Sequence, residues 1–167
     1  MKLYISNKVM SLGGSSVVYD ENKNQVYKVK GKFFTITAKK KIYDMNKNLI
    51  YIVRNKYFNF INKRAFIIRP DKTKEAVVKR KGLTFKNQYF IEGYQDEIAI
   101  TGNFLGWDLA ITKNGETIGT IKRNITAESF WLGKDSFCLE SEDEESMKFL
   151  VAVVIAIDNI IDKMKSK

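Results

Sequence analysis

The side chains best suited to bind a ligand in this 167-residue chain are two clusters of cations. Lys39-Lys40-Lys41 forms the first cluster, and Lys79-Arg80-Lys81 forms the second. Ammonium and guanidinium groups gathered near a loop can hold the phosphates of a lipid headgroup or of a nucleic acid. These six residues are therefore our candidate site for an anionic ligand. The structural alternative is that lysines on exposed edge strands keep sheets from pairing with one another.

Most catalytic chemistry lacks the residues it needs here. The chain has no histidine and a single cysteine, Cys138, which we expect to be buried in a strand. That composition excludes a Ser-His-Asp or Cys-His nucleophile and the ligands of a structural zinc site. An enzyme that uses two carboxylates remains the alternative, because their spacing in three dimensions is not visible in a sequence. We expect a non-enzymatic binding or regulatory module without a cofactor or a metal.

The charge of the chain is positive and unevenly distributed. Lysine and arginine number 29 and aspartate and glutamate 19, which gives a net charge of +10. Acids are sparse between Lys39 and Lys86 and gather instead from Glu140 to Glu145. Such a field attracts anionic membrane lipid or nucleic acid, and a lysine-rich surface that keeps the protein in solution is the alternative. Residues 1–8 hold no continuous apolar segment, so we expect a cytoplasmic protein, peripheral to the membrane at most.

The C-terminal stretch from Asp143 to Met164 predicts a helix. Its centre, Phe149 to Ile157, has no polar residue. A helix that is apolar on every side is buried either in a protein core or in a membrane. Acids before the run and lysines after it suit the charge distribution of a helix, and Ser141 or Asp143 can cap its start. The apolar run is about half of the roughly 20 residues that a bilayer span needs, so we expect a central core helix.

The preceding part of the chain, from residue 3 to 138, reads as short strands joined by turns. Residues 19–27 return as residues 43–51, and each copy contains a strand, a polar Asp/Asn turn and a second strand. Pro70-Asp71 and Asn114-Gly115 indicate further hairpins between alternating strands. The chain has one proline and no long linker, so we expect a single domain over residues 1–167.

These elements predict a mainly β fold. A long antiparallel sheet must hide its edges, and closure into a barrel of about twelve strands does so. Such a barrel is too wide to be filled by side chains alone, and the apolar helix can fill it. We therefore expect a closed antiparallel barrel around a buried C-terminal helix. The rival arrangement, a helix on one face of an open sheet, requires a polar helix face that residues 149–157 do not offer.

Aromatic residues supply the second candidate surface. Trp107 and Trp131, with Phe104 and Phe130 beside them, could form a platform on which bases stack. The nearby Lys122-Arg123 pair would supply cations for the phosphates. The alternative is that these aromatic side chains fill the barrel core.

The segment Gly102–Ile111 resembles part of the LURP-one-related family. Gly119–Arg123, Asp135–Phe137 and Ala152–Asp158 follow in the order of that family, and the resemblance covers nearly the whole chain. The fold of the family is similar to the tubby C-terminal domain and to phospholipid scramblases. The resemblance implies a twelve-stranded barrel threaded by the C-terminal helix, in agreement with the arrangement inferred above.

The same resemblance bears on partners. Tubby-like relatives bind phosphoinositide headgroups through basic residues, and scramblase relatives associate with membranes. Anionic phospholipid or a membrane surface is therefore the first expected partner. No headgroup-binding motif can be carried over residue by residue, and fold alone does not supply function. A nucleic-acid-binding or transcription-regulatory protein is the alternative, and the sequence indicates no particular protein partner.

Overall fold

The computed structural model describes residues 1–6, 15–31, 37–57, 64–80, 88–103, 108–124 and 136–165. The described residues form twelve strands and one helix, α1 (Met147–Lys165). The strands are β1 (Lys2–Ser6), β2 (Ser15–Asp20), β3 (Gln25–Gly31), β4 (Lys40–Asp44), β5 (Leu49–Asn55), β6 (Arg64–Ile68), β7 (Lys74–Arg80), β8 (Gln88–Glu92), β9 (Ile98–Asn103), β10 (Asp108–Lys113), β11 (Glu116–Asn124) and β12 (Ser136–Ser141). The sequence also predicts strands over residues 34–37, 83–85 and 129–132. All of these residues lie outside the described part of the chain except Thr37, which is in a turn.

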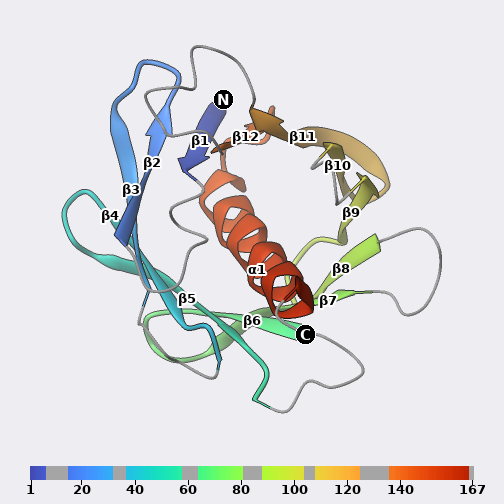
Figure 1. Cartoon of the computed structure of the whole chain (residues 1–167). Helices are drawn as coiled ribbons and strands as arrows, with labels where there is room; N and C mark the ends of the chain where they lie inside the picture. The colour runs from blue at the N-terminus through green and yellow to red at the C-terminus, as the bar shows by residue number, and fades with distance from the viewer. Residues whose placement is uncertain are drawn as a thin grey trace.

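The twelve strands close into an antiparallel barrel. Each strand pairs with its neighbours in sequence, and β1 pairs with both β2 and β12, so that the first and last strands complete the ring (Figure 1). Every described strand therefore has two neighbours, which leaves no edge open for another sheet to join. The predicted closed barrel is confirmed. The open sheet is excluded, and edge protection cannot explain the lysines of these strands.

The internal repeat forms two equivalent turns at one end of the barrel. The carboxylate of Asp20 accepts hydrogen bonds from the backbone and side-chain nitrogens of Asn24, at 2.7 and 2.9 Å. Asp44 and Asn48 repeat this arrangement at 2.7 and 2.8 Å. Lysine at the third position of each turn has a positive φ, which short Asp/Asn turns commonly contain. The predicted pair of hairpins is confirmed.

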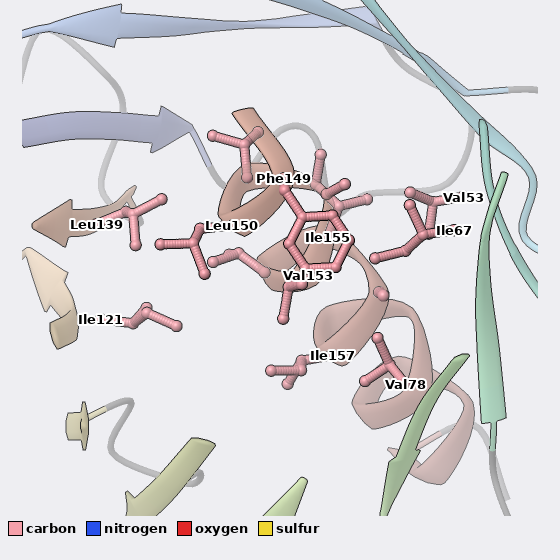
Figure 2. Close-up of a cluster of buried hydrophobic side chains, with 14 of the residues drawn as sticks. Val53, Ile67, Val78, Ile121, Leu139, Phe149, Leu150, Val153, Ile155 and Ile157 are labelled. Atoms are coloured by element: carbon pink, nitrogen blue, oxygen red, sulfur yellow. The ribbon is translucent and has the colours of Figure 1, made fainter. Parts of the chain in front are cut away.

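Helix α1 lies inside the ring of strands (Figure 1). Its side chains are buried from Phe149 through Ile161. Figure 2 shows Leu150, Ile155 and Ile157 of the helix among core side chains of the barrel. Those labelled on the strands are Val53, Ile67, Val78, Ile121 and Leu139. The helix and the barrel thus bury one another's apolar surface, as the sequence predicts.

The helix begins at Met147 rather than at Asp143. The Asp143 carboxylate accepts hydrogen bonds from the backbone nitrogen and the hydroxyl of Ser146, at 3.1 and 2.9 Å. The same carboxylate lies 2.6 Å from the Lys113 ammonium. Asp143 therefore caps the turn that leads into the helix. Glu140 lies on β12, and the other acids of this run lie in the connection between β12 and the helix.

Candidate anionic-ligand surface

Alternation along the strands places one row of cations on the outside of the barrel. Lys41, for example, lies between Lys40 and Ile42, which are both buried and face inward. The same alternation turns outward six cations on five neighbouring strands, which we call the basic strip. Its members are Lys28 and Lys30 on β3, Lys41 on β4, Arg54 on β5, Arg64 on β6 and Lys79 on β7.

Strand register places like charges of the basic strip directly opposite one another. Lys30 is the cross-strand partner of Lys41, and Arg64 is the partner of Lys79. Side chains at such positions have Cβ atoms roughly 5 Å apart, and like charges there destabilise a sheet. The Lys30–Lys41 pair is therefore unfavourable, whereas the charge of Lys79 is balanced by an ion pair with Glu92 on β8.

Two cations of the basic strip lie over aromatic rings. The Lys30 ammonium is 5.4 Å from the centre of the Tyr43 ring, and the Arg54 guanidinium is 5.1 Å from the centre of the Phe66 ring. Such contacts contribute on the order of 0.5–1 kcal/mol at exposed sites. They hold the charges against the barrel wall, where they face solvent as an ordered surface.

Acidic residues are rare on these strands. Strands β3 to β7 contain Asp44 and Glu75 only. Asp44 bonds within its own turn, and Glu75 forms an ion pair with Arg69 at the β6–β7 turn. On the adjacent strand β8, Glu92 forms an ion pair with Lys79. The surface over β3 to β7 is thus dominated by positive charge.

The two cation clusters of the sequence are divided by the strand geometry. Lys41 and Lys79 lie on the basic strip. Arg80 occupies an inward register position opposite the buried Tyr89, because neighbouring strand residues point to opposite faces. Lys39 precedes β4 and is partly buried, whereas Lys81 lies outside the described residues.

Lys40 has a different role from the one the sequence predicts. Its ammonium lies 3.4 Å from Asp158 Oδ2 of the helix, and the Lys40 residue is only 7% exposed. Beside this pair, the amide of Asn55 donates to the carbonyl of Asn159, and the amide of Asn159 donates to the carbonyl of Ala38, each at 2.9 Å. These bonds anchor the helix to the wall, so Lys40 cannot contact a ligand outside the barrel.

Four members of the basic strip were missed by sequence reasoning: Lys28, Lys30, Arg54 and Arg64. Lys28, Lys30 and Arg54 have no cation beside them in the sequence, and Arg64 follows a single lysine, Lys63. The signal that could have found them is their alternation with residues that face the core, such as Val29, Val53 and Ala65. Runs of like charge in a strand are misleading, because consecutive side chains leave opposite faces.

The other candidate residues contribute little to this surface. Cys138 lies on β12 as expected, but it faces outward and is only partly buried. Its pKa is raised mainly by burial, which disfavours the reactive thiolate. The aromatic platform residues (Phe104, Trp107, Phe130 and Trp131) lie outside the described residues. Within the described part of the chain, no group of three acidic or cysteine side chains could hold a metal ion.

Comparisons with known proteins agree with this architecture. The family model described as LURP-one-related matches residues 1–158. An X-ray structure of a protein from Arabidopsis thaliana superposes with a TM-score of 0.59 and 16% sequence identity, over 98% of this chain and 91% of that chain. At 16% sequence identity, this structural match shows a similar fold and carries no information about function. No curated protein matches the chain. Among the described residues, no helix is long and apolar enough to cross a membrane.

Proposed function

The chain belongs to the LURP-one-related family, and we propose that it is a non-enzymatic module that binds anionic surfaces through the basic strip. Phospholipid headgroups are the ligand that we place first. On this proposal, the protein is cytoplasmic and associates with the membrane at its surface. The resemblance to lipid-binding tubby-like proteins, implied by the sequence, points in the same direction.

The observation that carries this proposal is the pairing of like charges across strands. Lys30 lies directly opposite Lys41, a placement of like charges that lowers the stability of the free protein. A surface that brings phosphates between such cations would relieve the repulsion. The free energy of binding would then include both the attraction between cations and phosphates and the loss of repulsion between the cations. Binding thus explains an arrangement that is unfavourable for folding.

The uneven distribution of charge also favours binding over a general role in solubility. Outward positions on β9 and β10 include the small, uncharged Ala99, Thr101 and Ala110. Charges on the other described strands are of mixed sign, as in Asp108 opposite Lys122 and in the Lys2–Glu140 ion pair. A requirement for solubility alone would not separate a positive face from a face of mixed charge. The concentration of cations over β3 to β7 favours attraction toward one flat anionic partner.

Nucleic acid is the second candidate ligand. The cations stacked on Tyr43 and Phe66 combine positive charge with aromatic rings, a combination that single-stranded nucleic acid also uses. Binding of nucleic acid differs from binding of phospholipid because it can be measured with an oligonucleotide in the absence of lipid. The affinity for the oligonucleotide would fall steeply as the salt concentration rises.

Vesicle flotation with charge-matched variants tests the proposal. The strip variant is Lys30→Gln/Lys41→Gln/Arg64→Gln, and the control is Lys2→Gln/Lys122→Gln/Arg123→Gln on β1 and β11, so both lose three charges. Each basic residue near an anionic membrane contributes about 1 kcal/mol, so the strip variant should bind phosphatidylserine vesicles about a hundredfold more weakly. The control should retain most binding. Equal losses in both variants would show that net charge, and not the strip, matters.

Enzymatic turnover is not part of the proposal. Electrostatic binding requires no covalent bond to be made, and two cations of the strip, Lys30 and Arg54, lie over aromatic rings. A second test of the same variants is thermal unfolding. Removal of like charges from cross-strand pairs should leave the strip variant at least as stable as the wild type. A large drop in its melting temperature would indicate that these cations are structural.

A further inference from the structure

Large apolar side chains face outward on three of the strands that carry the basic strip. We call them the apolar patch: Ile52 on β5, Phe66 and Ile68 on β6, and Val77 on β7. Ile52, Phe66 and Ile68 are partly exposed, and Val77 is 9% exposed. They occupy positions that a barrel with a fully hydrated outer wall would give to polar residues.

The four side chains are continuous across the wall. Ile52 is the cross-strand partner of Ile68, and Phe66 is the partner of Val77. Cross-strand partners lie in direct contact range, and positions two apart along one strand share the same face. The patch is therefore one surface and not a scatter of single exposed residues.

The wall over β9 and β10 lacks such a surface. Its outward positions hold alanine and threonine at Ala99, Thr101, Ala110 and Thr112, and a charge at Asp108. Large outward side chains also occur elsewhere, such as Phe90 on β8 and Tyr4 on β1. The patch differs from them because its four apolar side chains adjoin one another, and a continuous, partly exposed apolar surface with a polar rim marks an interaction site.

Three of the four residues of the apolar patch have a cation as a cross-strand partner. Lys41 is the partner of Ile52, Arg54 is the partner of Phe66, and Lys74 is the partner of Ile68. The interaction surface therefore has an apolar centre and a positive rim. A partner that fits it needs negative charge at its surface and apolar material just behind that charge.

We infer that the apolar patch inserts into the interfacial region of an anionic bilayer while the basic strip engages the headgroups. This inference rests on the proposed function and specifies how the same surface works. An anionic bilayer offers phosphates at its surface and hydrocarbon a few ångströms deeper. Three of the four patch side chains are aliphatic and gain free energy in hydrocarbon, and the Arg54 guanidinium already lies over the ring of the fourth, Phe66.

A second copy of the chain fits this surface poorly. Two copies joined patch to patch would bring their positive rims together, and like charges across an interface are strongly unfavourable. Self-association through the patch would also need acids near it, whereas β3 to β7 contain only Asp44 and Glu75, both bonded elsewhere. An anionic bilayer offers hydrocarbon to the apolar patch and phosphates to its positive rim, so no like charges are brought together.

A polarity-sensitive thiol label locates the inserted surface. Two single-cysteine proteins are made on a Cys138→Ser background: Ile68→Cys within the patch and Thr101→Cys on β9, outside the patch. Phosphatidylserine-containing vesicles should shift the emission of the patch label to the blue, and nitroxides on the lipid chains should quench it. The Thr101→Cys label should show neither change.

The apolar part of binding is separated from the charged part by salt. Ile52→Ser/Ile68→Ser keeps every cation, so it should float with vesicles at low salt but lose binding at high salt by about tenfold or more relative to wild type. Thermal unfolding of both proteins checks that the fold survives.

The possible results are distinct. If wild type binds anionic vesicles while the patch label is unchanged and the serine variant floats normally, insertion is wrong and headgroup binding stands. If wild type does not bind such vesicles, the proposed function and this inference both fail. A blue shift with an oligonucleotide but not with vesicles would also overturn the inference and favour nucleic acid.

Discussion

The ammonium of Lys40 lies 3.4 Å from the Oδ2 of Asp158 inside the barrel, with the two residues 7% and 3% exposed. One partner comes from the wall and the other from the central helix. Apolar contacts are not directional, so a helix that is apolar all round gains little preference for one depth or rotation from them. The ion pair and the bonds of Asn55 and Asn159 supply that preference.

Removal of one partner of this pair should be more harmful than removal of both. Asp158→Ala leaves the Lys40 charge buried without compensation, and we expect a loss of about 3–5 kcal/mol in the free energy of unfolding. The double variant Lys40→Met/Asp158→Leu should recover most of that loss. Urea unfolding measures both. If Asp158→Ala were as stable as wild type, the pair would have no part in holding the helix.

A charge in the centre of the helix should prevent folding. Val154 is 0% exposed, and an aspartate there would bury a carboxyl group without a partner among apolar side chains. The cost of several kcal/mol is comparable with the whole stability of about 5–15 kcal/mol of an ordinary domain. Circular dichroism and gel filtration should show an unfolded or aggregated Val154→Asp protein. Lys148→Ala, at an exposed position of the same helix, should melt like wild type.

Gly119 on β11 is required by close backbone approach. A Cβ atom at this position would lie 2.2 Å from the carbonyl oxygen of Glu140 on β12, and a backbone atom cannot move aside without disturbing the pairing. Gly119→Ala should therefore cost about 3 kcal/mol or more, at the upper end of what overpacking causes.

Gly115→Ala is the comparison, because that turn residue has open space around it and a φ of +88°. Its cost should be about 1–2 kcal/mol, from backbone strain alone. Chemical denaturation of the two variants gives the difference. Equal stability of the two would contradict the close contact between β11 and β12.

Stability should fall at acid pH partly through Asp143. The hydrogen bond from Lys113, with those from Ser146, lowers the pKa of the Asp143 carboxyl below its usual value. A folded-state pKa below the unfolded one means that the charged form stabilises the fold above the unfolded pKa, near 4. This contribution is lost as pH falls from there through the folded pKa.

Asp143→Asn should consequently flatten the decline in melting temperature below about pH 4 while lowering the melting temperature at neutral pH. Glu142→Gln, at an exposed neighbouring position, is the matched control. An unchanged acid profile in Asp143→Asn would contradict the part assigned to the cap.

The architecture could be read from the sequence because two features constrain it together. The apolar run from Phe149 to Ile157 has no polar face, so it must be surrounded, and a closed ring of hairpins surrounds it. The sequence places the start of the helix at Asp143, four residues before its true start at Met147. Asp143 instead lies in the preceding turn, where its carboxylate bonds to Ser146 and to Lys113 of β10, and the sequence does not show the contact with Lys113.

The candidate surface was harder to read for the same physical reason. Lys40 and Lys41 are adjacent in sequence but lie on opposite sides of the wall. Lys30 and Lys41 are separated in sequence but are direct partners across β3 and β4. Cross-strand neighbours become visible only when register is known, and register depends on the whole barrel.

Lysine footprinting of the wild-type protein tests most directly whether the basic strip meets an anionic membrane. An amine-reactive reagent is applied with and without phosphatidylserine vesicles, and mass spectrometry reports the modification of each lysine. We predict that Lys28, Lys30 and Lys41 become protected, while Lys2 on β1 and Lys122 on β11, which lie outside the strip, react as before. Protection of Lys2 and Lys122 to the same degree, or no protection of the strip, would contradict the proposed function.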